Sequence, residues 1–382
     1  SRFARIYTPI VVFAAIALAL IPPMLTGDFA GSFATWLLRA LTFLIVSCPC
    51  ALVVSVPLAF FGGIGAASKA GILIKGSSYM DALAKADTVV FDKTGTLTKG
   101  VFEVTTLHPE EMDEKELLHL AAHVERYSTH PIAVSLRTAF GNEADGCAVE
   151  SVEEVAGQGI RAVVNGRTVC VGNSKMMDAI GAKWKSCDEA GTIIHVAVDG
   201  VYAGHIHISD IEKPDAKKAI AELKALGVGH TVMLTGDREE VAKRVASDLG
   251  LDEYHAELLP ADKVSGVEQL LQNRKEGASL VFVGDGINDA PVLARADIGV
   301  AMGAMGSDAA IEAADVVLMD DQPSKIAKAV RISRSTLAIA KQNIVFAIAV
   351  KVGILILAAF GLAPMWLAVF GDTGVLILCV LN

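Results

Sequence analysis

Most of the residues best suited to chemistry lie at the ends of three short apolar runs of the sequence, and one lysine lies elsewhere. They are Asp92 in "DKTGTLTKG", Thr235, Gly236 and Asp237 in "HTVMLTGD", Lys263 in "LLPADKV", and Asp285 and Asp289 in "GDGINDAP". A carboxylate at a strand tip can attack a phosphoryl group and form an aspartyl phosphate. Lys93 and the glycine-bearing turn after it would supply charge and backbone N–H groups for phosphate oxygens. Any single Asp could be a solvated loop acid, but the whole set has the parts needed for Mg²⁺-dependent phosphoryl transfer.

These residues require a scaffold that brings several strand ends together. The apolar runs at 87–92, 230–237 and 279–286 each end in Asp or Gly-Asp, and an amphipathic helical pattern occupies 213–227. Alternating strands and helices predict a parallel sheet with its ligands at the carboxyl ends of the strands.

A second domain is expected within the first. Between Gly100 and about Asp210 the pattern changes to short alternating strands with glycine turns. The stretch 159–173 predicts a hairpin around Asn165-Gly166. We therefore expect an inserted domain between two parts of the parallel-sheet domain.

Four apolar runs are long enough to cross a membrane, which takes about 20 residues. They are expected at 8–25, 33–61, 343–362 and 363–382. Lys and Arg flank only one side of the two resulting hairpins, at Arg2, Arg5, Lys69, Lys75, Arg331, Arg334 and Lys341. This bias places residues 71 to 334 in the cytoplasm.

The net charge and the cysteine spacing argue against two classes of interaction. The formal net charge is −10, which argues against nucleic acid as the main partner. The six cysteines have no regular framework, which favours reduced thiols over a disulfide scaffold.

Two cysteines and a proline interrupt the second apolar run, in "LIVSCPCALVV". Cys48 and Cys50 would lie about 200° apart on a regular helix, so they could not share a ligand there. Pro49 removes one N–H and obstructs the helix, and local unwinding would let both sulfurs converge. The alternative is a kinked helix with inert buried cysteines.

Two further membrane residues are charged: Lys351 in "AIAVKVGILIL" and Asp372 in "AVFGDTGVLIL". Charges in a membrane are costly and indicate function by default, with a structural ion pair as the alternative. Two thiolates and Asp372 would exceed the charge of a divalent cation by one, and Lys351 would restore neutrality. Without metal, Lys351 would pair with Asp372. A mixed sulfur and oxygen set suits Zn(II), Cd(II) and Pb(II).

Taken together, these motifs resemble those of the heavy-metal-transporting P-type ATPases, and the match covers essentially the whole chain in order. The resemblance implies a membrane protein with α-helical transmembrane hairpins and a cytoplasmic α/β phosphorylation domain of the haloacid dehalogenase fold, into which an α+β nucleotide-binding domain is inserted. It implies ATP and Mg²⁺ as cofactors. Residues 1–80 and 331–382 would each form two membrane helices, 81–99 and 212–330 the phosphorylation domain, and 100–211 the nucleotide-binding domain.

The resemblance also assigns roles by motif. Asp92 resembles the phosphorylated aspartate, and the Thr94 carbonyl and Asp285 resemble the Mg²⁺ ligands. Thr235 and Lys263 resemble the phosphate clamps, while Asn288 and Asp289 resemble the residues that support the metal and the nucleophile. Related phosphatases carry a general acid/base Asp where this chain has Thr94. Without it, the aspartyl phosphate should persist long enough for a conformational change.

The nucleotide contacts are expected from the resemblance as well. "ERYSTHPIA" (125–133) resembles the Ser-x-His-Pro element of the heavy-metal branch, although alone it indicates a turn before a proline-started helix. Glu125 and His130, followed by Pro131, are candidates to touch or position the nucleotide. The pair Gly157 and Gly159 resembles that branch's glycine pair, at which the backbone approaches the nucleotide. Asn173 resembles an adenosine-side contact.

Cys-Pro-Cys resembles the membrane metal site of the same branch. The copper-transporting members typically carry Tyr-Asn and Met-Ser-Ser in their later spans, and neither occurs here. Lys351 and the Asp-Thr-Gly at 372–374 resemble the zinc-, cadmium- and lead-exporting members. Cys147, Cys170 and Cys187 have no metal-like spacing, and Cys379 is expected to pack.

The sequence lacks the Thr-Gly-Glu of the family's actuator domain, the earlier membrane spans and the amino-terminal Cys-x-x-Cys. We therefore expect a fragment that works with those parts, in lipid, in the bacterial inner (plasma) membrane with its catalytic domains in the cytoplasm. The alternatives are a copper(I) pump, a membrane-anchored phosphatase, and a metal sensor or chaperone that uses Cys-Pro-Cys alone. The sensor leaves Asp92, Thr235, Lys263 and Asp285 unexplained.

Overall fold

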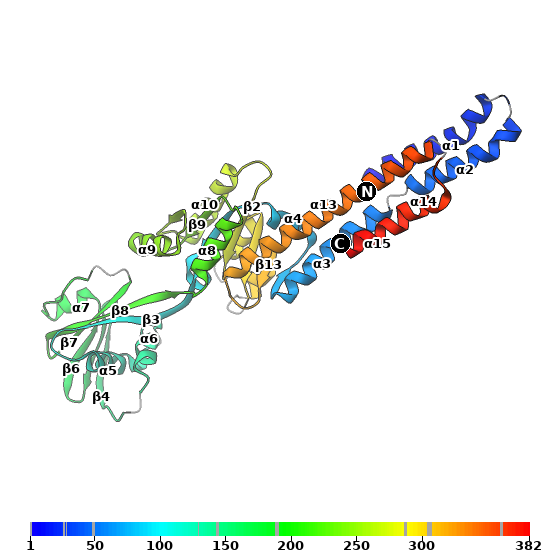
Figure 1. Cartoon of the computed structure of the whole chain (residues 1–382). Helices are drawn as coiled ribbons and strands as arrows, with labels where there is room; N and C mark the ends of the chain where they lie inside the picture. Colours follow the sequence, from blue (N-terminus) through cyan, green and yellow to red (C-terminus); the bar gives the residue numbers. More distant parts are fainter. Residues whose placement is uncertain are drawn as a thin grey trace. The chain divides into compact units, whose positions relative to one another are not determined.

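The structure is a computed structural model in which the chain forms two units (Figure 1). The helical unit comprises Ser1–Lys85 and Ala329–Asn382, and the α/β unit comprises Ala86–Lys328. The residues described are 2–25, 27, 29–47, 50–128, 130–142, 145–187, 191–285, 289–303, 308–359 and 362–382.

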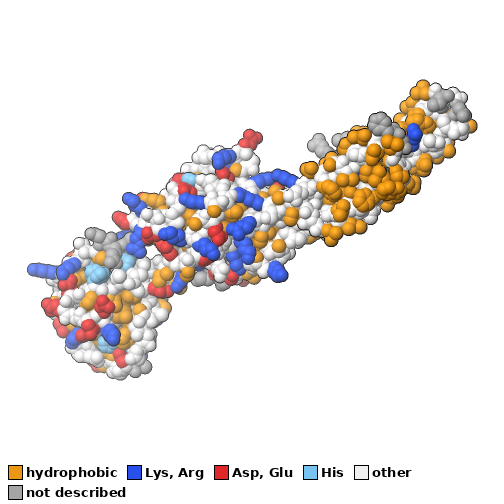
Figure 2. Space-filling model, viewed as in Figure 1, with side chains coloured by type: hydrophobic (Ala, Val, Ile, Leu, Met, Phe, Trp, Pro, Cys, Tyr) orange, Lys and Arg blue, Asp and Glu red, His pale blue; other side chains and the backbone are white. Residues whose placement is uncertain are grey.

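The helical unit consists mainly of long apolar helices. They are α1 (Arg2–Leu25), α2 (Phe29–Ser47), α3 (Cys50–Lys69), α13 (Ser324–Ala359, which begins in the α/β unit), α14 (Met365–Val369) and α15 (Val375–Leu381), with the short elements β1 (Ile72–Ile74) and α4 (Ser77–Ala84). Among the described residues, three stretches have the length and composition to cross a membrane: Thr8–Leu25, Phe29–Lys69 and Ser324–Ala358. Figure 2 shows apolar side chains gathered over this part of the chain. Such a surface suits lipid better than water.

Two of the expected membrane runs differ in detail from the structure. The third run is part of α13, whose 36 residues extend about 54 Å, well beyond the hydrocarbon thickness of a bilayer. The fourth is the shorter apolar stretch Met365–Leu381, interrupted by a π-helical turn, η3 (Phe370–Gly374). Apolar periodicity could not show that turn, because one extra residue in a helix leaves composition unchanged.

The helical unit packs around two small apolar clusters. Ala51, Ala347, Val375 and Cys379 join α3, α13 and α15. Val46, Ile354 and Ala368 join α2, α13 and α14. The expected packing role of Cys379 is confirmed, since its side chain is buried in the first cluster.

The α/β unit contains the expected parallel sheet. Its strands run in the order β13 (Val316–Leu318), β12 (Ile298–Met302), β11 (Ser279–Gly284), β2 (Ala86–Asp92), β9 (His230–Leu234) and β10 (Glu253–His255). The helices of this part are α8 (Ala216–Ala225), α9 (Glu239–Leu249), α10 (Pro260–Asn273), α11 (Ala290–Arg295) and α12 (Asp308–Ala313). β2 pairs in parallel with β11 on one side and β9 on the other, so the three apolar runs singled out in the sequence are neighbours.

The inserted part forms a second, antiparallel sheet. Its strand order is β3 (Thr98–Pro109), β8 (Val201–Glu212), β7 (Thr192–Val198), β6 (Arg167–Gly172), β5 (Gly159–Val164) and β4 (Val149–Val155). The accompanying helices are α5 (Glu114–Val124), the short η2 (Glu125–Tyr127), α6 (Pro131–Phe140) and α7 (Ser174–Ala179). The predicted hairpin is present: Asn165 and Gly166 both have positive φ, as a type I′ turn requires. The domain boundaries expected from the sequence stay a prediction.

Candidate active site and membrane charge pair

Asp92 is the last residue of β2 and lies in an acidic cluster with one ammonium group. Lys263, from α10, donates to the Asp92 carboxylate at 2.6 Å and to Asp289 at 3.2 Å. Asp285 follows β11, and one carboxylate oxygen from each of Asp92, Asp285 and Asp289 lies within 4.8 Å of the others. The structure thus brings together four residues that the sequence places up to 197 positions apart.

The charges of this cluster do not balance without a cation. Burial, and then the charge of Asp289, raise the pKa of Asp92 to about 7, although Lys263 opposes this shift. Burial disfavours the Lys263 ammonium, but Asp92 and Asp289 raise the pKa of Lys263 above its ordinary value. Counted alone, the three carboxylates and the Lys263 ammonium sum to −2 when ionised, and the buried Lys213 also interacts electrostatically with Asp285. Oxygen ligands with this excess of negative charge fit Mg²⁺.

The loop after Asp92 is held by two residues that the sequence analysis missed. Asp210, near the end of β8, accepts hydrogen bonds from the Thr98 hydroxyl at 2.5 Å and from the Gly100 N–H at 3.0 Å. Lys213 is buried and donates to the Gly95 carbonyl at 2.6 Å. Both lie where the inserted part returns to the parallel sheet. Their only signal in the sequence was charge at the point where the strand-like pattern of the inserted part gives way to the helical pattern at 213–227.

Gly95 must be glycine in this loop. Its φ is +73°, and a Cβ there would lie 2.5 Å from a carboxylate oxygen of Asp285. A side chain would therefore push the acidic cluster apart as well as strain the backbone.

A second strand end presents Thr235 and Asp237. Thr235 is buried after β9, and its hydroxyl accepts a hydrogen bond from the Asp237 N–H at 3.1 Å. The Asp237 carboxylate forms an ion pair with Lys93, which also lies 3.6 Å from Asp210. Lys93 is thus buried between two carboxylates. The expected role of Lys93 toward phosphate oxygens stays a prediction.

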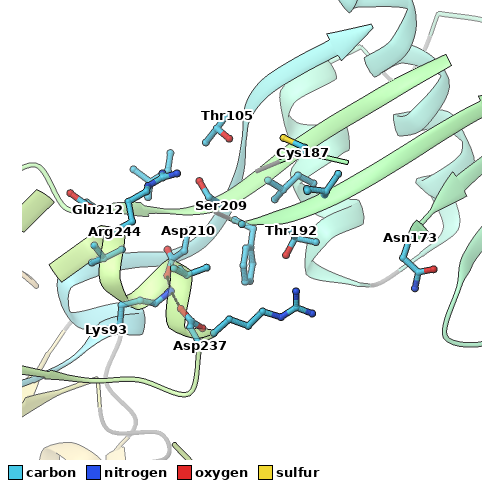
Figure 3. Close-up of a pocket in the computed structure, with 18 of the residues that line it drawn as sticks. Lys93, Thr105, Asn173, Cys187, Thr192, Ser209, Asp210, Glu212, Asp237 and Arg244 are labelled. Carbon is cyan, nitrogen blue, oxygen red and sulfur yellow. Dashed lines mark ion pairs between the residues drawn. The ribbon is translucent and has the colours of Figure 1, made fainter. Parts of the chain in front are cut away.

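A cleft of about 960 Å³ opens beside this ion pair, within the α/β unit. Figure 3 shows Lys93, Asp210 and Asp237 gathered at one end and Asn173 at the other. Gly236, Thr192 and Trp184 also line it. Of the predicted nucleotide contacts, Lys93 and Asn173 lie in this cleft, whereas Glu125, His130, Gly157 and Gly159 are not among its described lining residues.

Those other candidates lie near the junctions of α5, α6 and β5. Glu125 is buried, and burial raises the pKa of its carboxyl. His130 is exposed and is the N-cap of α6, its Nδ1 accepting from the Ile132 N–H at 3.3 Å. The Asn173 amide donates to the Gly157 carbonyl at 2.9 Å. The turn and proline-started helix considered as the plain interpretation of 125–133 are therefore present.

Gly159 has a structural reason to be glycine that needs no nucleotide. Its φ is +145°, and a Cβ there would lie 2.2 Å from the Val171 carbonyl oxygen of the paired strand β6. The expectation that the glycine pair exists for close approach to a nucleotide stays a prediction.

In the helical unit, Lys351 contacts Asp372, the pair expected from the sequence. The Lys351 Nζ lies 3.1 Å from the Asp372 carboxylate and donates to the Val46 carbonyl at 3.2 Å. Val46 is in the last turn of α2, where carbonyls lack helical partners. Lys351 therefore binds both the acid of the η3 turn and the carbonyl end of α2.

Several predicted site residues fall outside the part of the chain that the structure describes. Cys48, Pro49 and Asn288 lie outside the described residues, as do the side chains of Cys50 and Pro131. α2 ends at Ser47 and α3 begins at Cys50. Convergence of the two sulfurs stays a prediction.

Sequence comparison gives a family for this geometry. Residues 86–297, more than half of the chain, match the model of the haloacid dehalogenase-like hydrolases. The chain is 56% identical over its whole length to a cadmium-, zinc- and cobalt-transporting ATPase of Bacillus subtilis, and 53% identical to a zinc-transporting ATPase of Synechocystis. It spans about half the length of the curated relatives it matches, 54% and 53% of these two.

Solved structures of metal-transporting ATPases also match this chain. A zinc-transporting PIB-type ATPase in its E2.Pi state matches the whole chain with 39% identity and a TM-score of 0.87, over 62% of that protein. The catalytic domain of a CPx-ATPase matches 70% of this chain and 98% of its own length, with 30% identity and a TM-score of 0.55. The chain belongs to the haloacid dehalogenase-like hydrolases and, within them, to the metal-transporting P-type ATPases of the membrane.

Proposed function

We propose that this chain supplies the phosphorylation site, the nucleotide site and part of the membrane path of a pump that exports divalent metal ions at the expense of ATP. The observation that carries the proposal is the cluster of Asp92, Asp285 and Asp289 around the single ammonium of Lys263. Such a cluster provides a nucleophile, a cation and metal ligands at one point.

In the proposed reaction, an oxygen of Asp92 attacks the terminal phosphorus of ATP. A new O–P bond forms, the bond from that phosphorus to the bridging oxygen breaks, and ADP leaves. Lys263 and the Thr235 hydroxyl would hold the transferred phosphoryl oxygens. Mg²⁺, held by Asp92, Asp285 and the Thr94 carbonyl, would neutralise phosphate charge, while Asn288 and Asp289 would support the site.

We place ATP in the cleft beside Lys93 and Asp237. The cleft reaches from the strand end that carries Gly236 to Asn173. Its volume lies in the range of small-molecule sites. Glu125, His130, Pro131, Gly157 and Gly159 remain candidates for the adenosine end on the strength of the family resemblance alone.

The proposed cargo is Zn(II) or Cd(II), with Pb(II) and Co(II) as further candidates. Cys48, Cys50 and Asp372 would bind the ion, and Lys351 would balance its charge. The relatives are named for cadmium, zinc and cobalt, which agrees with a ligand set of sulfur and oxygen. We propose the bacterial inner membrane as the location, with the α/β unit in the cytoplasm, and an actuator portion that supplies the base for dephosphorylation.

The test follows acid-stable phosphate from labelled ATP on the full-length protein in detergent and lipid. Zn(II) and, under reducing conditions, Cu(I) would be compared as activators. Zn(II)-dependent turnover should be lost in Asp372→Ala, and phosphate incorporation should be lost in Asp92→Asn. Glu253→Gln, on the edge strand β10, is the matched control.

Two outcomes would contradict parts of the proposal. Activation by Cu(I) that is indifferent to Asp372 would overturn the metal assignment and leave the phosphoryl chemistry standing. Phosphate incorporation that persists in Asp92→Asn would overturn the chemistry itself.

A further inference from the structure

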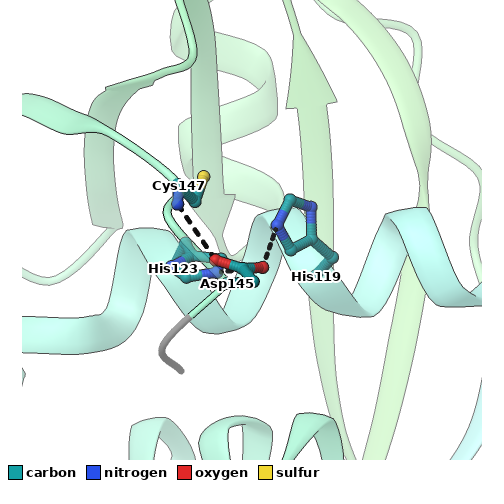
Figure 4. Close-up of side chains that lie close together, drawn as sticks. All are labelled: His119, His123, Asp145 and Cys147. Atoms are coloured by element: carbon teal, nitrogen blue, oxygen red, sulfur yellow. Dashed lines mark hydrogen bonds and ion pairs between the residues drawn. The ribbon is translucent and has the colours of Figure 1, made fainter. Parts of the chain in front are cut away.

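A second cluster of metal-ligating side chains lies in the inserted part of the α/β unit and shares no residue with the acidic cluster. It comprises His119 and His123 of α5 with Asp145 and Cys147, which precede β4 (Figure 4). One ligand atom from each of the four lies within 4.8 Å of all the others. The proposed pump mechanism uses none of these residues.

The two imidazoles face one carboxylate oxygen. The Nε2 atoms of His119 and His123 lie 2.9 and 3.1 Å from the same Asp145 oxygen, and the other Asp145 oxygen accepts the Cys147 N–H at 3.0 Å. Figure 4 shows His119, His123 and Asp145 pointing toward one another. Ligand nitrogens on successive helical turns, at i and i+4, lie on one face of a helix.

The chemistry of the set favours a borderline divalent metal over a hard one. Two imidazoles, one carboxylate and one thiol are the ligand types of tetrahedral zinc sites. A neutral imidazole pair with one carboxylate and one thiolate carries −2, which neutralises a divalent cation. Ligand atoms around Zn(II) lie about 3.3 to 3.7 Å apart, as follows from its bond lengths. The ligand atoms here lie within 4.8 Å of one another, so small side-chain rotations would bring them to the spacing of a zinc site.

The surroundings suit a site that is formed in advance but still accessible. His123 is buried, at 1% exposed, and its ring packs edge-on against Phe140, which also contacts His119. His119 and Asp145 are 25% and 20% exposed, so an ion can enter from solvent. His123 is therefore held by packing, while His119 and Asp145 remain accessible to solvent.

We propose that His119, His123, Asp145 and Cys147 bind a divalent ion of the Zn(II), Cd(II) or Co(II) class. The ion would join α5 to the segment that enters β4, and so fix the last turn of α5 directly before Glu125. Binding requires each imidazole to present the Nε2 lone pair and Cys147 to release its proton. This site shares no residue with the proposed membrane site for the transported ion. The proposal made here and the proposed function can therefore fail independently of each other.

The experiment uses the full chain in a background that lacks the proposed membrane ligands, Cys48→Ser with Cys50→Ser and Asp372→Ala. Saturating Mg²⁺ would occupy the acidic cluster. Co(II) is titrated under reducing conditions while the thiolate-to-cobalt charge-transfer band is followed, and Zn(II) is then added to displace it. We expect one equivalent of Co(II) with one thiolate ligand, displaced by Zn(II).

Ligand variants make the result specific. His119→Gln and Asp145→Asn should weaken binding by roughly 10- to 100-fold or more, and Cys147→Ser should abolish the charge-transfer band. Asp145→Asn retains hydrogen-bonding capacity, which guards against loss of folding. His255→Gln and Cys187→Ser, which alter residues outside the cluster, should leave the titration unchanged.

Absence of the band in the background chain would reduce Asp145 to an ion-pair partner of two histidines and overturn the proposal. A band that survives in Cys147→Ser would assign the thiolate to another cysteine and overturn it equally.

Discussion

At the residue scale, we propose that position 94 separates this chain from a simple phosphatase. Thr94 is exposed two residues after Asp92, and its backbone is extended. A hydroxyl there cannot act as a strong base toward water, so an aspartyl phosphate on Asp92 should persist. The same loop is held from behind by Asp210 and Lys213, so its geometry does not depend on the side chain at 94.

Thr94→Asp should shorten the lifetime of the phosphoenzyme by about 10²-fold, because it adds a general base beside the acyl phosphate. The lifetime is measured by chasing labelled phosphoenzyme with unlabelled ATP. Thr94→Asn has the same shape without the base and should show no acceleration. Equal lifetimes in Thr94→Asp and Thr94→Asn would mean that position 94 does not control water activation.

His195 gives the inserted part a pH-dependent stability. Burial and the neighbouring His205 lower the pKa of His195 to about 4, and its Nδ1 lies 3.0 Å from the Tyr202 hydroxyl. The unfolded chain takes up a proton near pH 6.5 and the folded chain only near pH 4, so stability is lost as pH falls between these values.

His195→Asn should therefore reduce the loss of unfolding free energy between pH 6.5 and pH 4 by roughly 2 to 3 kcal/mol. The measurement is the free energy of unfolding at several pH values between 4 and 7.5. His255→Asn, at an exposed position, serves as the control. An unchanged slope in His195→Asn would show that other groups cause the acid sensitivity.

At the element scale, the strand ends and the breaks in the helices position the sites. β2 lies between β9 and β11, so Asp92 is flanked by the residues that follow both neighbours. In the helical unit, the η3 turn places Asp372 against Lys351, which also binds the carbonyl end of α2. π-Helical turns are frequent at functional sites, as this one would be.

Gly159→Ala tests whether the glycine pair of the inserted sheet is structural. We expect a loss of roughly 2 to 4 kcal/mol of stability, because the added Cβ would meet the Val171 carbonyl at 2.2 Å and φ is positive. Thermal unfolding without nucleotide is the measurement.

Gly166→Ala is the matched control for Gly159→Ala. It also has positive φ, but no atom lies within 4 Å of its Cβ position, so we expect a loss of only about 1 kcal/mol. Similar small losses in both variants, with nucleotide affinity reduced only in Gly159→Ala, would favour direct approach to the nucleotide.

At the scale of the whole molecule, the α/β unit is built around its own apolar cores. One lies under the parallel sheet around Val90, Leu234 and Phe282, and another joins α5 and α6 to the antiparallel sheet. Figure 2 shows charged side chains distributed over this unit and few over the apolar helices. The two units thus have surfaces suited to different solvents.

A chain of residues 86–328 should consequently fold and bind nucleotide without the helical unit. We expect a single cooperative thermal transition and saturable binding of a non-hydrolysable ATP analogue, measured by calorimetry. Binding should weaken in Asp237→Ala, which removes the partner of Lys93 in the cleft. A broad transition with strong binding of a hydrophobic dye would show that the unit needs its membrane portion to fold.

Local patterns in the sequence determined much of this protein. Strand ends followed by Asp predicted that Asp92, Asp285 and Asp289 would meet, because parallel strands share one carboxyl edge. The Asn165-Gly166 hairpin and the Lys351–Asp372 pair were predicted for similarly local or electrostatic reasons, and the structure confirms them. Of the four predicted membrane-length runs, three are confirmed among the described residues, and the fourth is the shorter stretch Met365–Leu381.

Only the tertiary structure decided which distant side chains face each other. It turned Lys93 toward Asp237 and Asp210, made Asp210 and Lys213 the supports of the loop after Asp92, and interrupted the last helix at Asp372. It also brought Cys147 to the His119 and His123 pair, although no cysteine spacing predicted this and only His-x-x-x-His on a helix was a clue. Sequence periodicity fixes which face of an element is buried, whereas the packing of two elements sets the distance between their side chains.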